Sequence, residues 1–154
     1  MKLTDTAIEI AKKVKLLILD VDGVLTDGGI YFDDSGNEFK RFNSLDGHGI
    51  KMLLESGIEV GVISARSASA VAHRMKTLGV RHLYQNQANK NEALEQLLEK
   101  LSLGIKQVAV FHWHLDRDGV SGSRRSSFCR PSRLPAPRRM FLSWILAINI
   151  SPFS

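Results

Sequence analysis

The sequence predicts an α/β fold with a three-layer, parallel sheet at its centre. Two continuous apolar runs, Lys15–Val21 and Ile58–Ile63, are typical of strands covered by helices on both faces. Amphipathic stretches of about a dozen residues alternate with such runs, as in βαβ units. The length of 154 residues suits one domain, and we place it over residues 1–111.

The first half of the chain is expected to contain a short helix, a strand, a glycine-rich turn and a β-hairpin insertion. In chain order, these elements are expected at residues 6–13, 15–21, 22–29 and about 28–43. The hairpin is indicated by Gly28–Phe32 and Glu38–Asn43, because these segments flank a polar loop that contains Gly36.

Three helices and three strands are expected to follow the hairpin. The helices are expected at 49–56, 67–78 and 89–101, and the strands at 58–63, 82–84 and 107–111. Gly57 and Gly79 are placed to end the first two helices. Ser67 and Asn89 are placed to cap the second and third helices, and Glu92 completes a capping-box pattern with Asn89.

The composition changes abruptly after residue 111. Residues 1–111 hold 14 basic and 14 acidic side chains, so the formal net charge of +5 lies in 112–154, with seven arginines and two aspartates. A single cysteine, Cys129, excludes a disulfide framework and fits a reducing compartment. The apolar run Met140–Ile150 is too short to span a bilayer. We therefore expect a cytoplasmic protein with no membrane span.

Polar side chains follow the predicted strands at the edge where ligands bind in parallel sheets. Asp20 and Asp22 can offer oxygen ligands to a divalent cation, a nucleophile and a proton donor. Ser64 and Lys90 can bind a phosphoryl group. Taken singly, Asp20 and Asp22 would form an ordinary acidic turn. Ser64 would be a helix-entry residue, and Lys90 a solvated lysine. Together they predict phosphoryl transfer through an aspartyl-phosphate.

These residues lie in sequences that resemble the motifs of the haloacid dehalogenase-like phosphatases, which have a Rossmann-like core. Asp20–Gly28 resembles motif I, Ser64 in ISAR resembles motif II, and Lys90 in QANK resembles motif III. The closer resemblance is to the subfamily that acts on 3-deoxy-D-manno-octulosonate 8-phosphate. It covers about residues 14–111 and is carried by LLILDVDGVLTDGGIYFDDSGNEFKRFNSLDGHGIKML, EVGVISARSASAVAHRMKTLGV and HLYQNQANK.

The resemblance implies an Mg²⁺-dependent phosphomonoesterase of lipopolysaccharide sugar biosynthesis, which releases phosphate and the free sugar acid. Asp20 would be the nucleophile and a metal ligand. Asp22 would be the general acid/base and would bind the metal through its backbone carbonyl. Ser64 and Lys90 would bind the phosphate. The resemblance also implies a homotetramer, in which the hairpin assembles the subunits and screens a neighbour's active site.

The resemblance further implies a set of substrate-binding positions. Without it, Lys51 and Arg74 are ordinary solvated helix residues and Gly47 only serves a turn. Leu45 departs from the arginine of some relatives. The implied positions are Asp22, Asn43, Ser44, Leu45, Asp46, Gly47, Lys51, Arg66, Arg74 and Lys90. His48 and His73 are expected to be surface or packing residues.

The resemblance ends after the strand expected at 107–111. Motif IV of the family reads Gly-Asp-Asp-x-x-Asp, and here the matching positions read His112-Trp113-His114-Leu115-Asp116-Arg117. Trp113 stands where a metal-binding carboxylate is expected, so we expect impaired activity. Residues 112–154 are interpreted as an aberrant Arg/Ser/Pro-rich tail, produced by a shifted reading frame, in place of the family's remaining strand and helices.

Several alternatives stay open. Asp116 or Asp118 could replace the missing metal ligand, and His112 with His114 could bind a transition metal. Nucleic-acid binding by the arginines is disfavoured, because no recognition element accompanies them. The substrate could be a related acylneuraminate phosphate. The chain could also be a catalytically inactive scaffold that still forms oligomers.

Overall fold

A parallel four-stranded sheet forms the centre of the computed structural model, which describes residue 9 and residues 11–111. The strands are β1 (Leu16–Leu19), β4 (Glu59–Ile63), β5 (His82–Tyr84) and β6 (Val108–Phe111), in the order β5-β4-β1-β6. In the register, Leu17 lies opposite both Val60 and Ala109. The predicted α/β fold with a parallel sheet is confirmed.

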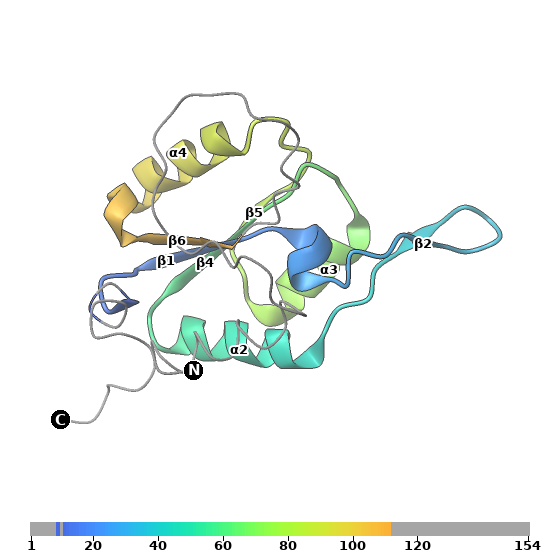
Figure 1. Cartoon of the computed structure of the whole chain (residues 1–154), viewed down its shortest axis with the longest axis horizontal. Coiled ribbons are helices and arrows are strands. Elements are labelled where there is room, and N and C mark those ends of the chain that lie inside the picture. The colour runs from blue at the N-terminus through green and yellow to red at the C-terminus, as the bar shows by residue number, and fades with distance from the viewer. Residues whose placement is uncertain (1–8, 10, 112–154) are drawn as a thin grey trace, which may run out of the picture.

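Helices cover both faces of this sheet (Figure 1). Helices α2 (Ser44–Glu55) and α3 (Ser69–Leu78) pack on one face, and α4 (Lys90–Leu101) packs on the other. A short 3₁₀ turn, Ile105–Gln107, leads into β6. None of the helices over the described residues is long and apolar enough to cross a membrane.

The hairpin strands β2 (Tyr31–Phe32) and β3 (Glu38–Phe39) form a separate antiparallel pair. Figure 1 shows this pair projecting from the three-layered core at the end where the wide turn Val21–Leu25 also lies. An isolated antiparallel bridge between Thr26 and Phe42 joins the two arms of the hairpin at its base. The hairpin predicted from the sequence is therefore present.

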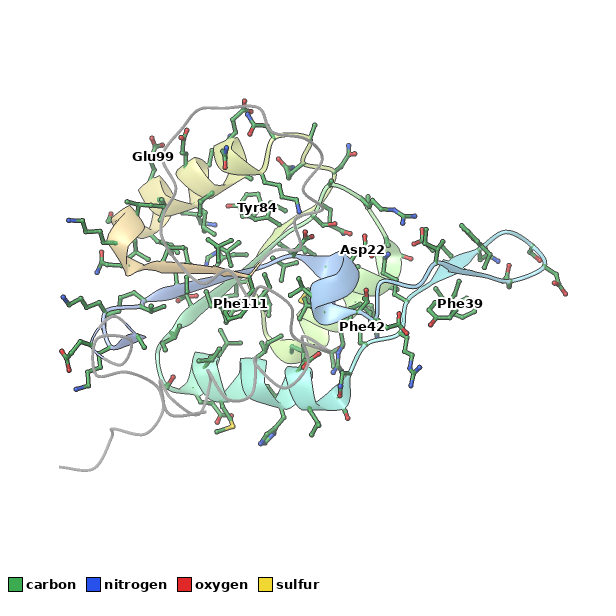
Figure 2. All side chains as sticks on the ribbon, in the orientation of Figure 1. Asp22, Phe39, Phe42, Tyr84, Glu99 and Phe111 are labelled. Atoms are coloured by element: carbon green, nitrogen blue, oxygen red, sulfur yellow. The ribbon has the colours of Figure 1, made fainter. Side chains whose placement is uncertain are left out.

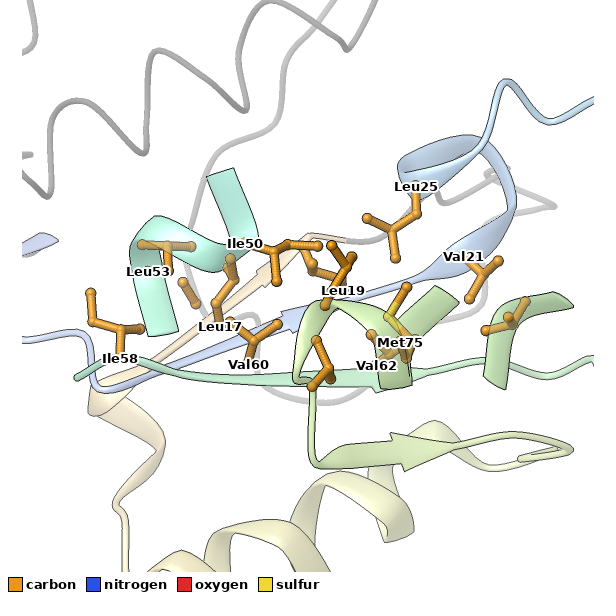
Figure 3. Close-up of a cluster of buried hydrophobic side chains, with 14 of the residues drawn as sticks. Leu17, Leu19, Val21, Leu25, Ile50, Leu53, Ile58, Val60, Val62 and Met75 are labelled. Atoms are coloured by element: carbon orange, nitrogen blue, oxygen red, sulfur yellow. The ribbon is translucent and has the colours of Figure 1, made fainter. Parts of the chain in front are cut away.

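The apolar core consists of two clusters, because successive side chains of β1 point to opposite faces of the sheet. Leu17 and Leu19 face α2 and α3, where Ile50, Leu53 and other apolar side chains enclose them (Figure 3). Leu16 and Ile18 face α4 and belong to the other cluster. Because both faces of β1 are buried, its sequence is continuously apolar.

Gly61 of β4 lets α4 approach the sheet closely. A Cβ atom at this position would lie 2.8 Å from Cδ1 of Ile18 and 3.0 Å from Cδ2 of Leu97. Real Cβ atoms rarely come so close to a neighbour, so a side chain here would push the helix away from the sheet.

Helix α2 begins at Ser44, five residues before the predicted start at Gly49. The side chain of Asn43 accepts a hydrogen bond from the Leu45 N–H at 2.9 Å and so caps the helix. Gly47 and Gly49 are buried inside the helix instead of forming a turn before it. The early start was missed because both glycines disfavour a helix when they are judged by propensity alone.

Helix α3 begins at Ser69, and Ala68 occupies the N-cap position, so the prediction that Ser67 caps this helix was wrong. The Ala68 N–H donates instead to Oε1 of Gln85 at 2.8 Å, a contact between loops distant in sequence. The predicted end of α3 is confirmed, since Gly79 adopts the left-handed conformation with φ 82°.

Helix α4 is capped as predicted. The side chain of Asn89 accepts from the Asn91 N–H at 3.1 Å and donates to Glu92 at 2.7 Å. Of the helix expected at 6–13, residues 6–8 and 10 fall outside the described residues, and Glu9 and Ala11 are helical. The interpretation of 112–154 as an aberrant tail falls wholly outside them.

Candidate active site

Asp20 lies at the carboxyl end of β1, where the chain leaves the sheet. Its Oδ1 accepts a hydrogen bond from the Val21 N–H at 2.7 Å. Asp22 lies in the wide turn Val21–Leu25, and Gly23, with φ 77°, reverses the chain direction directly after it. The Asp20 side chain is 13% exposed and that of Asp22 is 35% exposed. Both carboxylates therefore lie at the same sheet edge, with Asp22 nearer to solvent.

Thr26 fixes the shape of the loop that holds these two carboxylates. Its buried Oγ1 accepts hydrogen bonds from the Gly23 and Gly28 N–H groups, both at 3.3 Å, and donates to the Val21 carbonyl at 3.4 Å. One side chain thus satisfies three backbone groups in a segment that has no regular ladder.

Lys90, the first residue of α4, reaches the Asp20 carboxylate. Its Nζ donates to Oδ2 of Asp20 at 2.5 Å, which joins residues 70 positions apart in the chain. This ion pair neutralises the carboxylate in the absence of a ligand. An ammonium group at this point also offsets the repulsion that Asp20 would exert on an anionic phosphoryl group.

Ser64 directly follows β4 at the same sheet edge. Its N–H donates to the Tyr84 carbonyl at 2.9 Å, its carbonyl accepts from the Gln87 N–H at 3.0 Å, and its Oγ accepts from the Arg66 N–H at 3.2 Å. These contacts fix the backbone of Ser64, so the position of its hydroxyl is set by the sheet.

Lys40 and Glu38 belong to the site although the sequence analysis did not include them. Nζ of Lys40 donates to Oδ1 of Asp22 at 2.7 Å and to Oε1 of Glu38 at 3.0 Å. Nη2 of Arg66 donates to Oε2 of Glu38 at 2.8 Å. Figure 2 shows Asp22 at the turn beside the base of the hairpin, with Phe39 farther out. We call the side chains of Asp22, Glu38, Lys40 and Arg66 the hairpin-base network.

The environment of Lys40 favours its charged form. Burial alone would lower the pKa of Lys40, but the hydrogen bonds and negative charges of Asp22 and Glu38 outweigh it and raise the pKa above the usual value. Sequence reasoning could have found this residue, since Glu38 and Lys40 lie two apart in the extended segment expected over Glu38–Asn43, where they would share one face.

A small pocket of about 110 Å³ opens beside the Asp20–Lys90 pair. Its polar lining comes from Asp20, Lys90 and Asn91, and its apolar lining from Ile18, Ile63, Leu94, Val110 and Phe111. A water molecule takes up about 30 Å³ of liquid. The pocket therefore holds a group of a few heavy atoms, not a whole sugar.

The substrate-binding positions implied by the resemblance do not all lie together. Asn43 to Gly47 form the cap and first turn of α2, and a Cβ on Gly47 would lie 2.3 Å from Nη2 of Arg74, so these two residues are in contact. Lys51 instead lines a shallow groove with the last turn of α3, and Asp20 does not line this groove. His48 and His73 are exposed.

The described residues supply only part of a metal site. Within residue 9 and residues 11–111, no group of three His, Cys, Asp or Glu side chains could hold a metal ion. Asp20 and Asp22 offer the hard oxygen atoms that Mg²⁺ prefers, but each is paired with a lysine. The position at which motif IV would add a carboxylate, Trp113, is outside the described residues.

The fold and the candidate active site can be compared with those of known classes of protein. No protein-family model matches the chain. A solved structure of a haloacid dehalogenase superfamily hydrolase, subfamily III A, from Legionella pneumophila is 43% identical, with a TM-score of 0.66 over 68% of this chain and 57% of that chain. The resemblance to the haloacid dehalogenase-like phosphatases is thereby confirmed for the core.

The resemblance extends to particular phosphatases. The 3-deoxy-D-manno-octulosonate 8-phosphate phosphatase KdsC of Escherichia coli K12 is 52% identical over 99 residues, which are 64% of this chain and 53% of the relative. The phosphatase of the same name from Moraxella catarrhalis, solved with a magnesium ion, a phosphate ion and KDO, is 38% identical, with a TM-score of 0.68 over 70% of this chain and 62% of that chain. The chain spans about half the length of the curated relatives it matches.

Proposed function

We propose that residues 1–111 carry the phosphoryl-transfer residues of a cytoplasmic phosphatase that hydrolyses 3-deoxy-D-manno-octulosonate 8-phosphate. The observation that carries this proposal is the ion pair between Asp20 and Lys90, 2.5 Å apart beside the pocket at the sheet edge. The similarity to phosphatases of that name supports the choice of substrate.

In the first half of the proposed reaction, Asp20 is the nucleophile. Its carboxylate oxygen bonds to phosphorus while the bond from phosphorus to the sugar oxygen breaks, and the Asp22 carboxyl group donates a proton to that departing oxygen. Ser64 and Lys90 bind the phosphoryl oxygens. Lys90 leaves its pairing with Asp20 only in part, because both the nucleophile and the phosphoryl group attract it.

In the second half, Asp22 acts as a base. Its carboxylate takes a proton from water as the water oxygen bonds to phosphorus and the bond from phosphorus to Asp20 breaks. Phosphate leaves, and Asp22 is again protonated for the next cycle. The greater exposure of Asp22 compared with Asp20 suits a group that must meet both the leaving sugar and water.

A divalent cation, for which Mg²⁺ is the first candidate, would neutralise the negative charges of the Asp20 carboxylate and the substrate phosphate. The described residues offer only Asp20 and Asp22 to it. We expect turnover well below that of a phosphatase with a complete motif IV. Asp116 or Asp118 remains the candidate replacement ligand.

The substrate-binding positions implied by the resemblance lie in different parts of the described core. Asn43, Ser44 and Leu45 begin α2 and Arg66 follows β4, so these residues can reach the sugar acid. Asp46 and Gly47 are buried in α2, and Arg74 of α3 contacts Gly47. For Lys51, in the third turn of α2, the proposal rests on the resemblance alone. Leu45 is exposed in the first turn of α2, at a position where some relatives have an arginine, and a related acylneuraminate phosphate stays the alternative substrate.

A second candidate function is an oligomerising scaffold without catalysis. It is favoured by the exposed apolar side chains of the hairpin, Ile30, Phe32 and Phe39, together with the sequence departure at Trp113. The scaffold would keep the homotetramer that the resemblance implies while losing turnover.

Phosphate release from a panel of acid-sugar phosphates, with and without Mg²⁺, tests these candidates. We expect Mg²⁺-dependent release that falls to background in Asp20→Asn and is retained in Asp34→Asn, a control in the exposed hairpin loop. Release that survives Asp20→Asn would contradict the proposed nucleophile. Folded, oligomeric protein without any release would support the scaffold.

A further inference from the structure

The hairpin-base network joins three segments that lie far apart in the sequence. Asp22 comes from the turn after β1, Lys40 and Glu38 from the base of the hairpin, and Arg66 from the loop after β4. Charges alternate along it, since Asp22 pairs with Lys40, Lys40 with Glu38, and Glu38 with Arg66. The proposed reaction uses Asp22, but it gives Lys40 and Glu38 no role.

Lys40 differs from an ordinary surface lysine. Its side chain is 3% exposed, and its ammonium group donates to two carboxylates. A buried ammonium is tolerated only where such partners replace water. The next residue provides a contrast, since Arg41 is 71% exposed and lies 3.9 Å from Asp27. The hairpin therefore buries one of two adjacent cations, and the buried one contacts Asp22.

Asp22 needs such a contact to keep its position. Its backbone has φ −72° and ψ 121° within the turn, and Gly23 follows with φ 77°. A residue next to glycine in a non-helical turn is not held by a regular ladder of hydrogen bonds. The ion pair with Lys40, at 2.7 Å, directs the Asp22 carboxylate toward the base of the hairpin.

We propose that Lys40 is a positioning residue, which the hairpin carries into the site to hold the Asp22 carboxylate for proton transfer. Glu38 orients Lys40, and its contact with Arg66 fixes the base of the hairpin to the loop that follows Ser64. This inference rests on the proposed function, in which Asp22 moves the proton. It adds that the hairpin sets the geometry of proton transfer within its own chain.

The first test needs no catalytic turnover. We would record nuclear magnetic resonance spectra of the full chain and of Lys40→Met, Lys40→Arg and the matched control Arg41→Met. We expect the backbone amide signals of Asp22 and Gly23 to move in Lys40→Met and to return toward their original positions in Lys40→Arg. They should stay in place in Arg41→Met. Unchanged Asp22 and Gly23 signals in Lys40→Met would overturn the proposal.

The reciprocal variant covers the case in which Lys40→Met fails to fold. In the unsubstituted chain, the buried Lys40 ammonium group should give a side-chain signal protected from exchange with water. Asp22→Asn should shift that signal and weaken its protection, because one of its two carboxylate partners is gone. A Lys40 signal that is unprotected, or that ignores Asp22→Asn, would overturn the proposal without any need for Lys40→Met.

The second test separates positioning from substrate binding. With an acid-sugar phosphate that turns over, Lys40→Met should lower kcat by about tenfold to a hundredfold and leave KM within about twofold, as expected when a reacting group is misplaced. Lys40→Arg should recover most of kcat, and Arg41→Met should match the unsubstituted chain. A rise in KM with kcat unchanged would make Lys40 a substrate contact and overturn the proposal. If no substrate turns over, the proposed function fails, and the spectra still decide the role of Lys40.

Discussion

At the scale of single residues, Thr26 shows how a polar side chain can stand in for secondary structure. The loop after β1 must place Asp20 and Asp22 at one edge although it has no ladder of backbone hydrogen bonds. The buried Thr26 hydroxyl accepts from two N–H groups and donates to one carbonyl of that loop. The motif I threonine is therefore a structural residue of the candidate site.

Thr26→Val should destabilise the chain by about 1–3 kcal/mol, because the Gly23 and Gly28 N–H groups lose their acceptor. Valine keeps the shape of threonine, so packing changes little. Urea unfolding measures the difference. The control is Thr77→Val, since the Thr77 hydroxyl is exposed and donates only to the His73 carbonyl. We expect a change within about 0.5 kcal/mol there. Equal losses at both positions would contradict the role of Thr26.

The residues of the candidate site were predictable to different degrees. Asp20, Ser64 and Lys90 follow strands or begin a helix, and the carboxyl ends of parallel strands meet at one edge whatever the loops do. Lys40 and Glu38 reach the site only because the hairpin folds back on the Val21–Leu25 turn. Their position depends on backbone angles at Gly23 and Gly28, which the residue pattern does not specify.

At the scale of secondary structure elements, Gly61 sets the distance between α4 and the sheet. Gly61→Ala should destabilise the chain by about 1–3 kcal/mol, because the new methyl group would meet Ile18 and Leu97. Thermal or urea unfolding measures this loss. Gly104→Ala is the control, since its Cβ would have its nearest neighbour at 3.8 Å. A stabilised Gly61→Ala would show that α4 packs less tightly than the structure indicates.

The hairpin loop depends on the charge of Asp33. Its carboxylate accepts from the Asn37 side chain and from the Asn37 and Ser35 N–H groups, and these bonds hold the pKa of Asp33 below its ordinary value. A lowered folded pKa means that this support is complete above the unfolded pKa and is lost as pH falls through the folded one.

We therefore expect the loop to loosen only below about pH 4. The Asn37 side-chain amide signal, followed by nuclear magnetic resonance during an acid titration, should move in that range. In Asp33→Asn the same signal should show no such step. A step centred above pH 5 would contradict the assignment to Asp33.

Element types were easier to predict from the sequence than element boundaries. The central strands β1 and β4 were found because both of their faces are covered, which makes their sequences almost continuously apolar. The start of α2 was placed too late, because Gly47 and Gly49 looked like turn residues. In the structure Gly47 lies against the Arg74 guanidinium of α3, which is a tertiary contact. The pattern of a single segment does not contain such information.

At the scale of the whole molecule, the described core and the hairpin have different surfaces. The core buries its apolar side chains between α2, α3, α4 and the sheet. The hairpin leaves Ile30, Phe32 and Phe39 between 51% and 61% exposed. An isolated two-stranded hairpin gains little stability from its own contacts. Such a surface on a projecting element is typical of contact between protein chains.

The last prediction concerns assembly through the hairpin. The chain should elute as an oligomer, and the double variant Phe32→Ser with Phe39→Ser should elute as a smaller species. Burying one phenylalanine contributes about 1.5–3 kcal/mol, so losing two weakens association by about a hundredfold or more. Size-exclusion chromatography with light scattering, over a dilution series, measures the change.

Ile105→Ser provides the matched control for this experiment. Ile105 is as exposed as the hairpin phenylalanines, at 55%, but it lies in the turn before β6. Its substitution should leave the oligomer intact, because the hairpin surface is unchanged. If the double variant and the unsubstituted chain elute alike, the hairpin does not hold the subunits together. If Ile105→Ser alone dissociates the oligomer, the contact lies on the β6 side of the core instead.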